Sequence, residues 1–132
     1  MAVIFCNGAP ATAAQLGAAA LVNYGHFTSL QVRGGATQGL ELHLQRLQEG
    51  SRALFGQELT PAQVRVQMQT ALQASAMADA SVRITVFAQD YDFRNPLREV
   101  ALDVLVAVSP PLDMPGTGLR AVSYTHLRAH ET

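Results

Sequence analysis

A run of strand-forming residues that leads directly into two glycines constrains this chain most. Phe27, Leu30 and Val32 lie in a segment that favours a strand, and the strand pattern resumes at position 36. Between the two, Gly34 and Gly35 can adopt the positive φ angles that a tight hairpin turn requires. We therefore predict a β-hairpin, whose apolar face must be covered by another element.

Leucines at positions 40, 44, 47 and 54 recur at helical spacing just after the hairpin. They predict an amphipathic helix over residues 40–54, with Gln45, Gln48 and Ser51 facing solvent.

A second helix is predicted to begin after Thr60. Pro61 suits the first helical position, and Gln63 can reach back to complete a capping box with the Thr60 hydroxyl. The buried stripe of this helix is expected to consist of Val64, Met68, Leu72 and Ala76.

Three further strands are predicted from apolar runs and from alternation. Residues 2–6 form a short apolar run, and residues 82–86 alternate apolar and polar side chains. Residues 99–108 are almost continuously apolar, as expected for a central strand. Residues 12–23 favour either a short helix or an ordered loop, because Gly17 weakens an alanine-rich stretch. The predicted fold class is α+β, a mostly antiparallel sheet with two main helices packed on one face.

Length and charge limit the possible functions. The chain has 132 residues, which suffices for one domain with its own core. Only 14% of the residues are charged, so part of the surface is expected to be hidden in a larger body or an oligomer. The formal net charge of -1 gives no long-range field that would attract nucleic acid or an anionic membrane. The apolar N-terminal run does not fit a signal peptide or a spanning helix, so a cytoplasmic location is predicted.

Neither the single cysteine nor a pair of histidines near the end predicts a metal site. Cys6 is expected to be a small core residue, because one thiol cannot form an internal disulfide or a thiolate cluster. His126 and His130 have a spacing seen in zinc sites, but no third ligand accompanies them.

The last part of the chain differs in composition from the rest. Residues 1–108 are predicted to form one small domain, and the proline- and glycine-rich residues 109–121 an interdomain linker and the start of a truncated large domain. Residues 122–132 resemble one reading frame of a transposon-type sequencing-library adapter. They are therefore predicted to be an artefact without evolved structure.

The hairpin and the helix after it resemble a known family. The residues that carry the resemblance are Tyr24-Gly25, residues 27–32, Gly34-Gly35 and His43-Leu44-Gln45-Arg46-Leu47. Together they are similar to the N-terminal small domain of the fold-type IV pyridoxal-phosphate enzymes. These enzymes include the class IV aminotransferases, aminodeoxychorismate lyase, and the branched-chain and D-amino acid transaminases. His26 and Thr28 depart from the more acidic family pattern, which leaves the substrate class open.

The resemblance implies particular site residues. Arg46 would hold the phosphate of pyridoxal 5'-phosphate, since a guanidinium can pair bidentately with phosphate oxygens. Spacing alone favours a surface arginine paired with Glu49, and only the resemblance reverses that preference. Phe27, Tyr24 and Arg94 are implied to contact the substrate, although Phe27 also suits a core position and Tyr24 a structural one.

No catalytic residue is assigned to this chain. All nine basic residues are arginine, so no lysine can form a Schiff base. His43 is expected to be a packing histidine rather than a general base. The implied function is that of a truncated N-terminal domain of a homodimeric, pyridoxal-phosphate-dependent class IV aminotransferase or related lyase. That enzyme would act on an amino acid/keto acid pair, and this part would not be competent alone. The alternative is a non-catalytic α+β binding or oligomerisation module.

Overall fold

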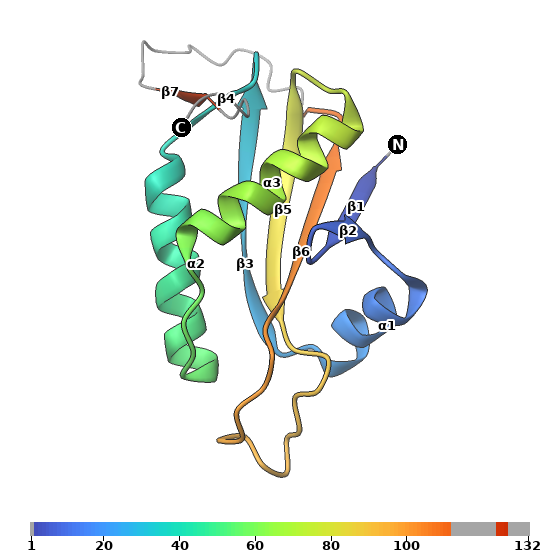
Figure 1. Cartoon of the computed structure of the whole chain (residues 1–132), viewed down its shortest axis with the longest axis vertical. Helices are drawn as coiled ribbons and strands as arrows, with labels where there is room; N and C mark the ends of the chain where they lie inside the picture. The colour runs from blue at the N-terminus through green and yellow to red at the C-terminus, as the bar shows by residue number, and fades with distance from the viewer. Residues whose placement is uncertain (1, 112–123, 127–132) are drawn as a thin grey trace.

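The computed structural model describes residues 2–111 and 124–126 and places helices against an antiparallel sheet (Figure 1). The elements in these ranges are β1 (Val3–Cys6), β2 (Ala9–Pro10), α1 (Ala13–Val22), β3 (Gly25–Arg33), β4 (Ala36–Gln38), α2 (Leu40–Phe55), α3 (Pro61–Ser75), β5 (Ala80–Phe87), β6 (Asp103–Ser109) and β7 (Tyr124–His126). The strand order is β2-β1-β6-β5-β3-β4-β7, and each neighbouring pair is antiparallel. The predicted α+β class is confirmed.

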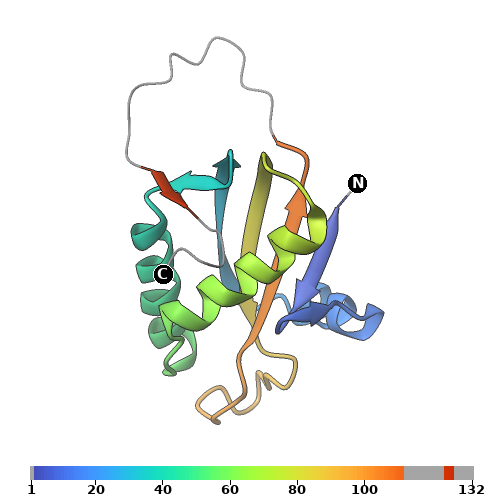
Figure 2. The ribbon, with the colours of Figure 1, turned by 45° about the horizontal axis from the view of Figure 1, so that its top comes forward.

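The core lies between the sheet and helices α2 and α3. Figure 2 shows α3 crossing in front of the strands, with α2 running beside β3. The largest fully buried side chains are almost all aliphatic: Leu40, Leu47, Met68, Ile84, Val32, Val64, Val82, Val86, Val104, Val106, Val108 and Thr37. Because strand side chains alternate between faces, the other face of the same strands is left to different residues.

The predicted helix over residues 40–54 is present as α2, but one detail of it was wrong. Ser51 does not face solvent: its exposed fraction is 0%. A small hydroxyl is tolerated there because it donates a hydrogen bond to the Leu47 carbonyl, 2.9 Å away, and also contacts His26. Leu40, Leu44 and Leu47 are buried as predicted.

Helix α3 begins at Pro61 as expected, but its termini differ from the prediction. The capping box does not form, because the Thr60 hydroxyl is oriented toward Gln63 Oε1, 3.5 Å away, rather than toward a backbone N–H. Ala76 is exposed and does not belong to the buried stripe. It follows the end of the helix and takes a φ of 57°, which turns the chain toward β5.

The segment over residues 12–23, which the sequence left open, is helix α1. The Thr12 hydroxyl accepts a hydrogen bond from Gln15 N at 3.1 Å, and the Gln15 side chain accepts one from Thr12 N at 2.8 Å. This capping box outweighs the low helix propensity of Gly17. No residue of α1 is fully buried.

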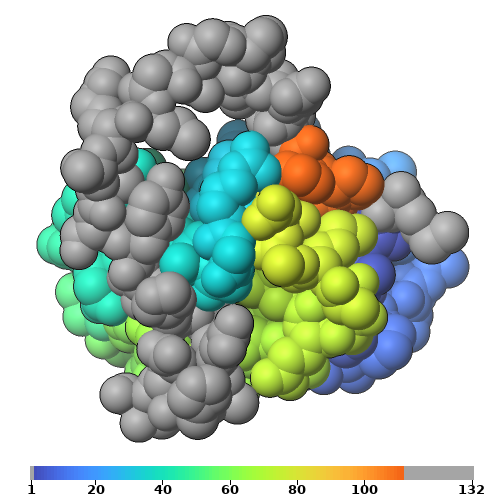
Figure 3. Space-filling model, turned by 90° about the horizontal axis from the view of Figure 1, so that it is seen from above, coloured from blue at the N-terminus to red at the C-terminus, as the bar shows by residue number. Residues whose placement is uncertain are grey.

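The predicted central strand starts later than expected. Strand β6 runs from Asp103 to Ser109 between β1 and β5, whereas residues 99–102 belong to the β5–β6 loop. Val100 N donates to the Gln57 side chain at 2.9 Å instead of to a neighbouring strand. The turn of the β3–β4 hairpin lies at the opposite end of the sheet, beside the α3–β5 connection (Figure 3). There, Gly34 N donates to the Asp79 carboxylate at 2.8 Å.

Strand β7 pairs with the outer edge of β4, with Thr125 opposite Thr37. It is the one part of residues 122–132 that lies within the described residues, and residues 112–121 of the predicted linker and large-domain start lie outside them. The domain boundaries and the adapter origin stay predictions. Among the described residues, no helix has the length and apolar character needed to cross a bilayer.

Candidate functional site

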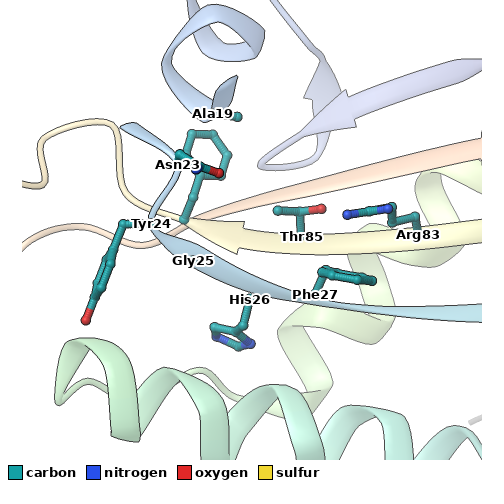
Figure 4. A pocket seen from close by; sticks show the side chains of 9 residues that line it. Ala19, Asn23, Tyr24, Gly25, His26, Phe27, Arg83 and Thr85 are labelled. Carbon is teal, nitrogen blue, oxygen red and sulfur yellow. The ribbon is translucent and has the colours of Figure 1, made fainter. Parts of the chain in front are cut away.

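A pocket of about 300 Å³ opens on the sheet face that points away from α2 and α3. Its walls come from the end of α1, the start of β3 and the last part of β5 (Figure 4). Phe27 pairs with Thr85 across β3 and β5, and Gly25 pairs with Phe87, so these residues share one face. We call this the outer face of the sheet.

Phe27 and Arg83 form the most specific contact in this pocket. The Arg83 guanidinium carbon lies 3.8 Å from the centre of the Phe27 ring, a cation–π geometry. Phe27 is 53% exposed, so the expectation that it could be a core residue is wrong. The ring holds the guanidinium at the pocket, where its N–H groups can meet a carboxylate or phosphate.

Arg83 was not among the residues singled out from the sequence. A signal was present, because Arg83 interrupts the apolar pattern at an outward position of a predicted strand. The sequence did not indicate which residue it would meet. That depended on β3 and β5 being neighbours in the sheet, although strand β4 and helices α2 and α3 separate them along the chain.

Tyr24 lines the same pocket and also joins an aromatic cluster. Its ring stacks on Tyr91 with centroids 4.2 Å apart, and it meets Phe55 and Phe93 edge to face. Its hydroxyl donates to the Leu54 carbonyl at 2.8 Å, which is the structural role considered for it. Burial and the Tyr24 hydrogen bond raise the pKa of Tyr91. The cluster fixes the start of β3 against the end of α2 and against the β5–β6 loop.

Arg94 lies in that loop, next to Phe93, and does not line the pocket. Its side chain is 94% exposed and its Nε atom is 3.4 Å from Asp92 Oδ1. A pair so exposed contributes little energy and leaves the guanidinium free to reorient. The structure therefore brings Phe27 and Tyr24 together and leaves Arg94 outside.

Arg46 is exposed on α2 and does not line the pocket either. With about 100° of rotation per residue, it lies on the same flank of α2 as His43. Glu41, which reaches Arg65 of α3 at 3.7 Å, lies on the opposite flank. The alternative pairing with Glu49 is not seen, because Glu49 accepts a hydrogen bond from Gln45 at 3.2 Å. Arg46 forms no ion pair within residues 2–111 and 124–126.

Two histidines lie between β3 and α2. His26 Nε2 is 3.0 Å from the Ser51 hydroxyl, and His43 Nδ1 is 2.7 Å from the Thr28 hydroxyl. Burial lowers the pKa of both imidazoles, and the positive charge of Arg46 lowers that of His43 further. His43 is half-buried and hydrogen-bonded, as expected of a packing histidine.

Other candidate chemistry is not supported in the described residues. Cys6 is buried as predicted, and burial together with the nearby Asp103 carboxylate raises the pKa of its thiol to about 11. The thiol is therefore protonated at neutral pH and is a poor nucleophile. Across residues 2–111 and 124–126, no group of three or more His, Cys, Asp or Glu side chains is arranged to hold a metal ion.

The sequence profile of the family Amino-transferase class IV matches residues 25–131. Because this match covers most of the chain, the protein belongs to the class IV aminotransferase family. A comparison with curated proteins gave no match.

Solved structures share the fold. The 4-amino-4-deoxychorismate lyase of Pseudomonas aeruginosa is 27% identical, with a TM-score of 0.66 over 86% of this chain and 42% of its own. The branched-chain amino acid aminotransferase of Escherichia coli is 17% identical, with a TM-score of 0.67 over 82% of this chain and 39% of its own. The chain thus spans about two fifths of the length of these enzymes. Another branched-chain amino acid aminotransferase, 16% identical with a TM-score of 0.66, was crystallised with pyridoxamine 5'-phosphate.

Proposed function

We propose that this chain forms the small-domain wall of a pyridoxal-phosphate-dependent enzyme, an aminotransferase or related lyase that acts on an amino acid/keto acid pair. The single observation that carries this proposal is the outer-face pocket in which the Arg83 guanidinium lies over the Phe27 ring. An aromatic wall beside a fixed cation suits a small substrate with an apolar part and a carboxylate. Membership of the class IV family supports the same reading.

In this proposal the chain's own residues bind and orient. Phe27 and Tyr24 form the apolar wall, and Arg83 pairs with a carboxylate of the substrate. Arg94 can swing toward the same substrate from the β5–β6 loop. No catalytic residue is assigned, because the chain has no lysine.

One hydrogen-bond donor on α2, the Arg46 guanidinium, is suited to contact a phosphate. Arg46 is permanently charged, exposed and not engaged by Glu49, so it can present two parallel N–H groups to phosphate oxygens. When bound, pyridoxal 5'-phosphate supplies an electron-withdrawing ring for chemistry at the substrate's α-carbon. The chain's contribution would be to hold the phosphate and to shield one side of the site from water.

A second copy of the chain is the macromolecular partner that we propose. Several large apolar side chains are strongly exposed, among them Leu21 at 87%, Leu42 at 64%, Phe93 at 62% and Leu97 at 95%. Exposed apolar groups of this size favour burial in an interface. A homodimer would cover them, and it accommodates the alternative view of the chain as an oligomerisation module. A cytoplasmic location remains a prediction from the sequence.

The test compares pyridoxamine 5'-phosphate with pyridoxamine, which lacks the phosphate. Neither probe carries an aldehyde that could react with the N-terminal amine. We expect the chain to prefer the phosphorylated probe, and Arg46→Ala to weaken its binding by about tenfold or more without affecting pyridoxamine. Equilibrium dialysis measures both affinities.

Arg52→Ala is the matched control, because Arg52 lies on the same helix but is already paired with Glu58. It should bind both probes as the unsubstituted chain does. Equal binding of the two probes, or equal effects of the two arginine substitutions, would remove Arg46 from the phosphate site.

A further inference from the structure

Two hydrogen bonds between imidazole and hydroxyl groups join β3 to α2, and the imidazole is on the strand in one bond and on the helix in the other. In one, the imidazole of His26 is on the strand and the hydroxyl of Ser51 is on the helix. In the other, the hydroxyl of Thr28 is on the strand and the imidazole of His43 is on the helix. The atoms are 3.0 and 2.7 Å apart. We call these two bonds the imidazole clamps.

The chemistry of the first clamp is fully determined by its neighbours. Ser51 donates its only hydroxyl proton to the Leu47 carbonyl at 2.9 Å. It can therefore only accept from His26, whose Nε2 must carry the proton. The Ser51 hydroxyl is completely buried, so it has no access to water as a substitute partner.

Strand and helix approach so closely here that one position allows no side chain. A Cβ atom at Gly50 would lie 2.7 Å from His26 Nδ1. The imidazole thus occupies the space that a side chain at position 50 would otherwise fill. This close fit indicates that the ring of His26 is held in place and is not a loosely packed surface group.

The clamps bracket Arg46 along the helix. His43 lies three residues before Arg46 and Ser51 five residues after it, so each attachment point is within about one and a half turns. Between the clamps, the helix–strand contact is made by leucines such as Leu44 and Leu47, whose packing is not directional. Beyond them, at the end of α2, the Tyr24 hydroxyl donates to the Leu54 carbonyl. Leucines alone would tolerate small rotations or translations of α2, whereas a hydrogen bond fixes its register.

We propose that His26 and His43 are positioning residues that fix the register of α2 on β3 and so aim the exposed Arg46 guanidinium at an anionic phosphoryl group. The identity of that group rests on the proposed function. The positioning itself rests on the two hydrogen bonds and on the close approach at Gly50. Neither histidine contacts the reacting atoms in this scheme.

The sharpest variants remove a hydroxyl while keeping the shape of the side chain. Thr28→Val and Ser51→Ala each delete one partner of a clamp, and Ser29→Ala is the control, because Ser29 is exposed on the outer face of the same strand. Hydrogen exchange of the α2 amides reports how firmly the helix is held. Affinity for pyridoxamine 5'-phosphate reports how well Arg46 is aimed.

Each clamp variant is expected to speed exchange in α2 and to weaken phosphate-dependent binding by about threefold to tenfold, while Ser29→Ala changes neither. His43→Ala should act like Thr28→Val, and the pair should show no further loss when combined, because they remove the same bond. His43→Asn should recover much of the loss, because its side-chain amide places a polar atom near the original Nδ1 position.

Two outcomes overturn the proposal. Unchanged α2 exchange in both Thr28→Val and Ser51→Ala would show that the clamps do not hold the helix. Faster exchange with unchanged binding would show that helix register does not aim Arg46. A different result, no preference for the phosphorylated probe in the unsubstituted chain, contradicts the proposed function instead. The exchange rates then still decide whether the clamps hold α2.

Discussion

The two faces of the sheet use the same strands for different purposes. On the helix-covered face of β5, Val82, Ile84 and Val86 are at most 1% exposed and form the centre of the core. On the outer face, Arg83 and Thr85 alternate with them and line the pocket. Side chains two positions apart therefore share a role, whereas adjacent ones do not. The strand provides stability with one set of residues and a binding surface with the other.

The largest expected effect sharpens this contrast by truncating neighbouring residues of β5. Ile84→Ala should lower the free energy of unfolding by about 2–5 kcal/mol, because it leaves a cavity in a fully buried site. Thr85→Ala should cost about 1 kcal/mol or less, since Thr85 lies at the rim of an open pocket. Urea unfolding followed by circular dichroism measures both. Similar losses for the two variants would mean that the faces do not divide stability and binding in this way.

A smaller effect concerns the contact between helix α2 and the helix-covered face of the sheet. Alanine normally stabilises a helix relative to glycine by about 0.5–1 kcal/mol. Gly17→Ala in α1 should follow this rule, because an added Cβ meets nothing within 4 Å. Gly50→Ala in α2 should instead destabilise the fold by about 1–3 kcal/mol, since the new Cβ would displace the His26 ring.

Thermal unfolding of the two glycine variants gives the comparison directly. Opposite signs are expected, although both substitutions improve helix propensity. In a His26→Ala background the added methyl at position 50 has room, so its cost should disappear. If Gly50→Ala is as stabilising as Gly17→Ala in the unsubstituted chain, the imidazole is not held against α2.

The elements that could be predicted are those whose signal is local in sequence. The leucines of α2 and the alternation of residues 82–86 each show the periodicity of one element. This periodicity can be recognised without knowing what packs against the element. The α+β class followed from the order of these patterns. Ser51 was misjudged for the same reason, because a polar residue on the edge of an apolar stripe is assigned to solvent unless its partner, here His26, is known.

The candidate site was only partly predictable, because it depends on which strands are neighbours. Phe27 and Tyr24 were named from the resemblance, and the structure places both in the pocket. Arg83 was not named, since its contact with Phe27 arises from the pairing of β3 with β5. No local pattern encodes that pairing. The assignment of Arg46 to a phosphate remains a prediction that the binding comparison decides.

The smallest expected effect is a dependence of stability on pH that comes from His26 and His43, which lie between α2 and the helix-covered face of the sheet. Burial lowers the pKa of His26 and His43 in the folded chain, so the unfolded chain takes up protons first as the pH falls. Stability should therefore be unaffected by these groups above about pH 6.5 and should decrease as the pH drops below that value. The positive charge of Arg46 acts on His43 in the same direction as burial. The β5 residues opposite His26 and Thr28, which are Val86 and Ile84, do not titrate.

The pH effect is separated from other titrations by replacing both histidines. In the double variant His26→Gln, His43→Asn, the amides retain hydrogen-bonding capacity but cannot be protonated in this range. The difference in unfolding free energy between the two chains should therefore shrink as the pH is lowered from 7 toward 5, by less than the cost of Ile84→Ala. A constant difference across that range would mean that the imidazoles remain as easily protonated in the fold as in water. The helix-covered face would then lack the desolvation that distinguishes it from the outer face.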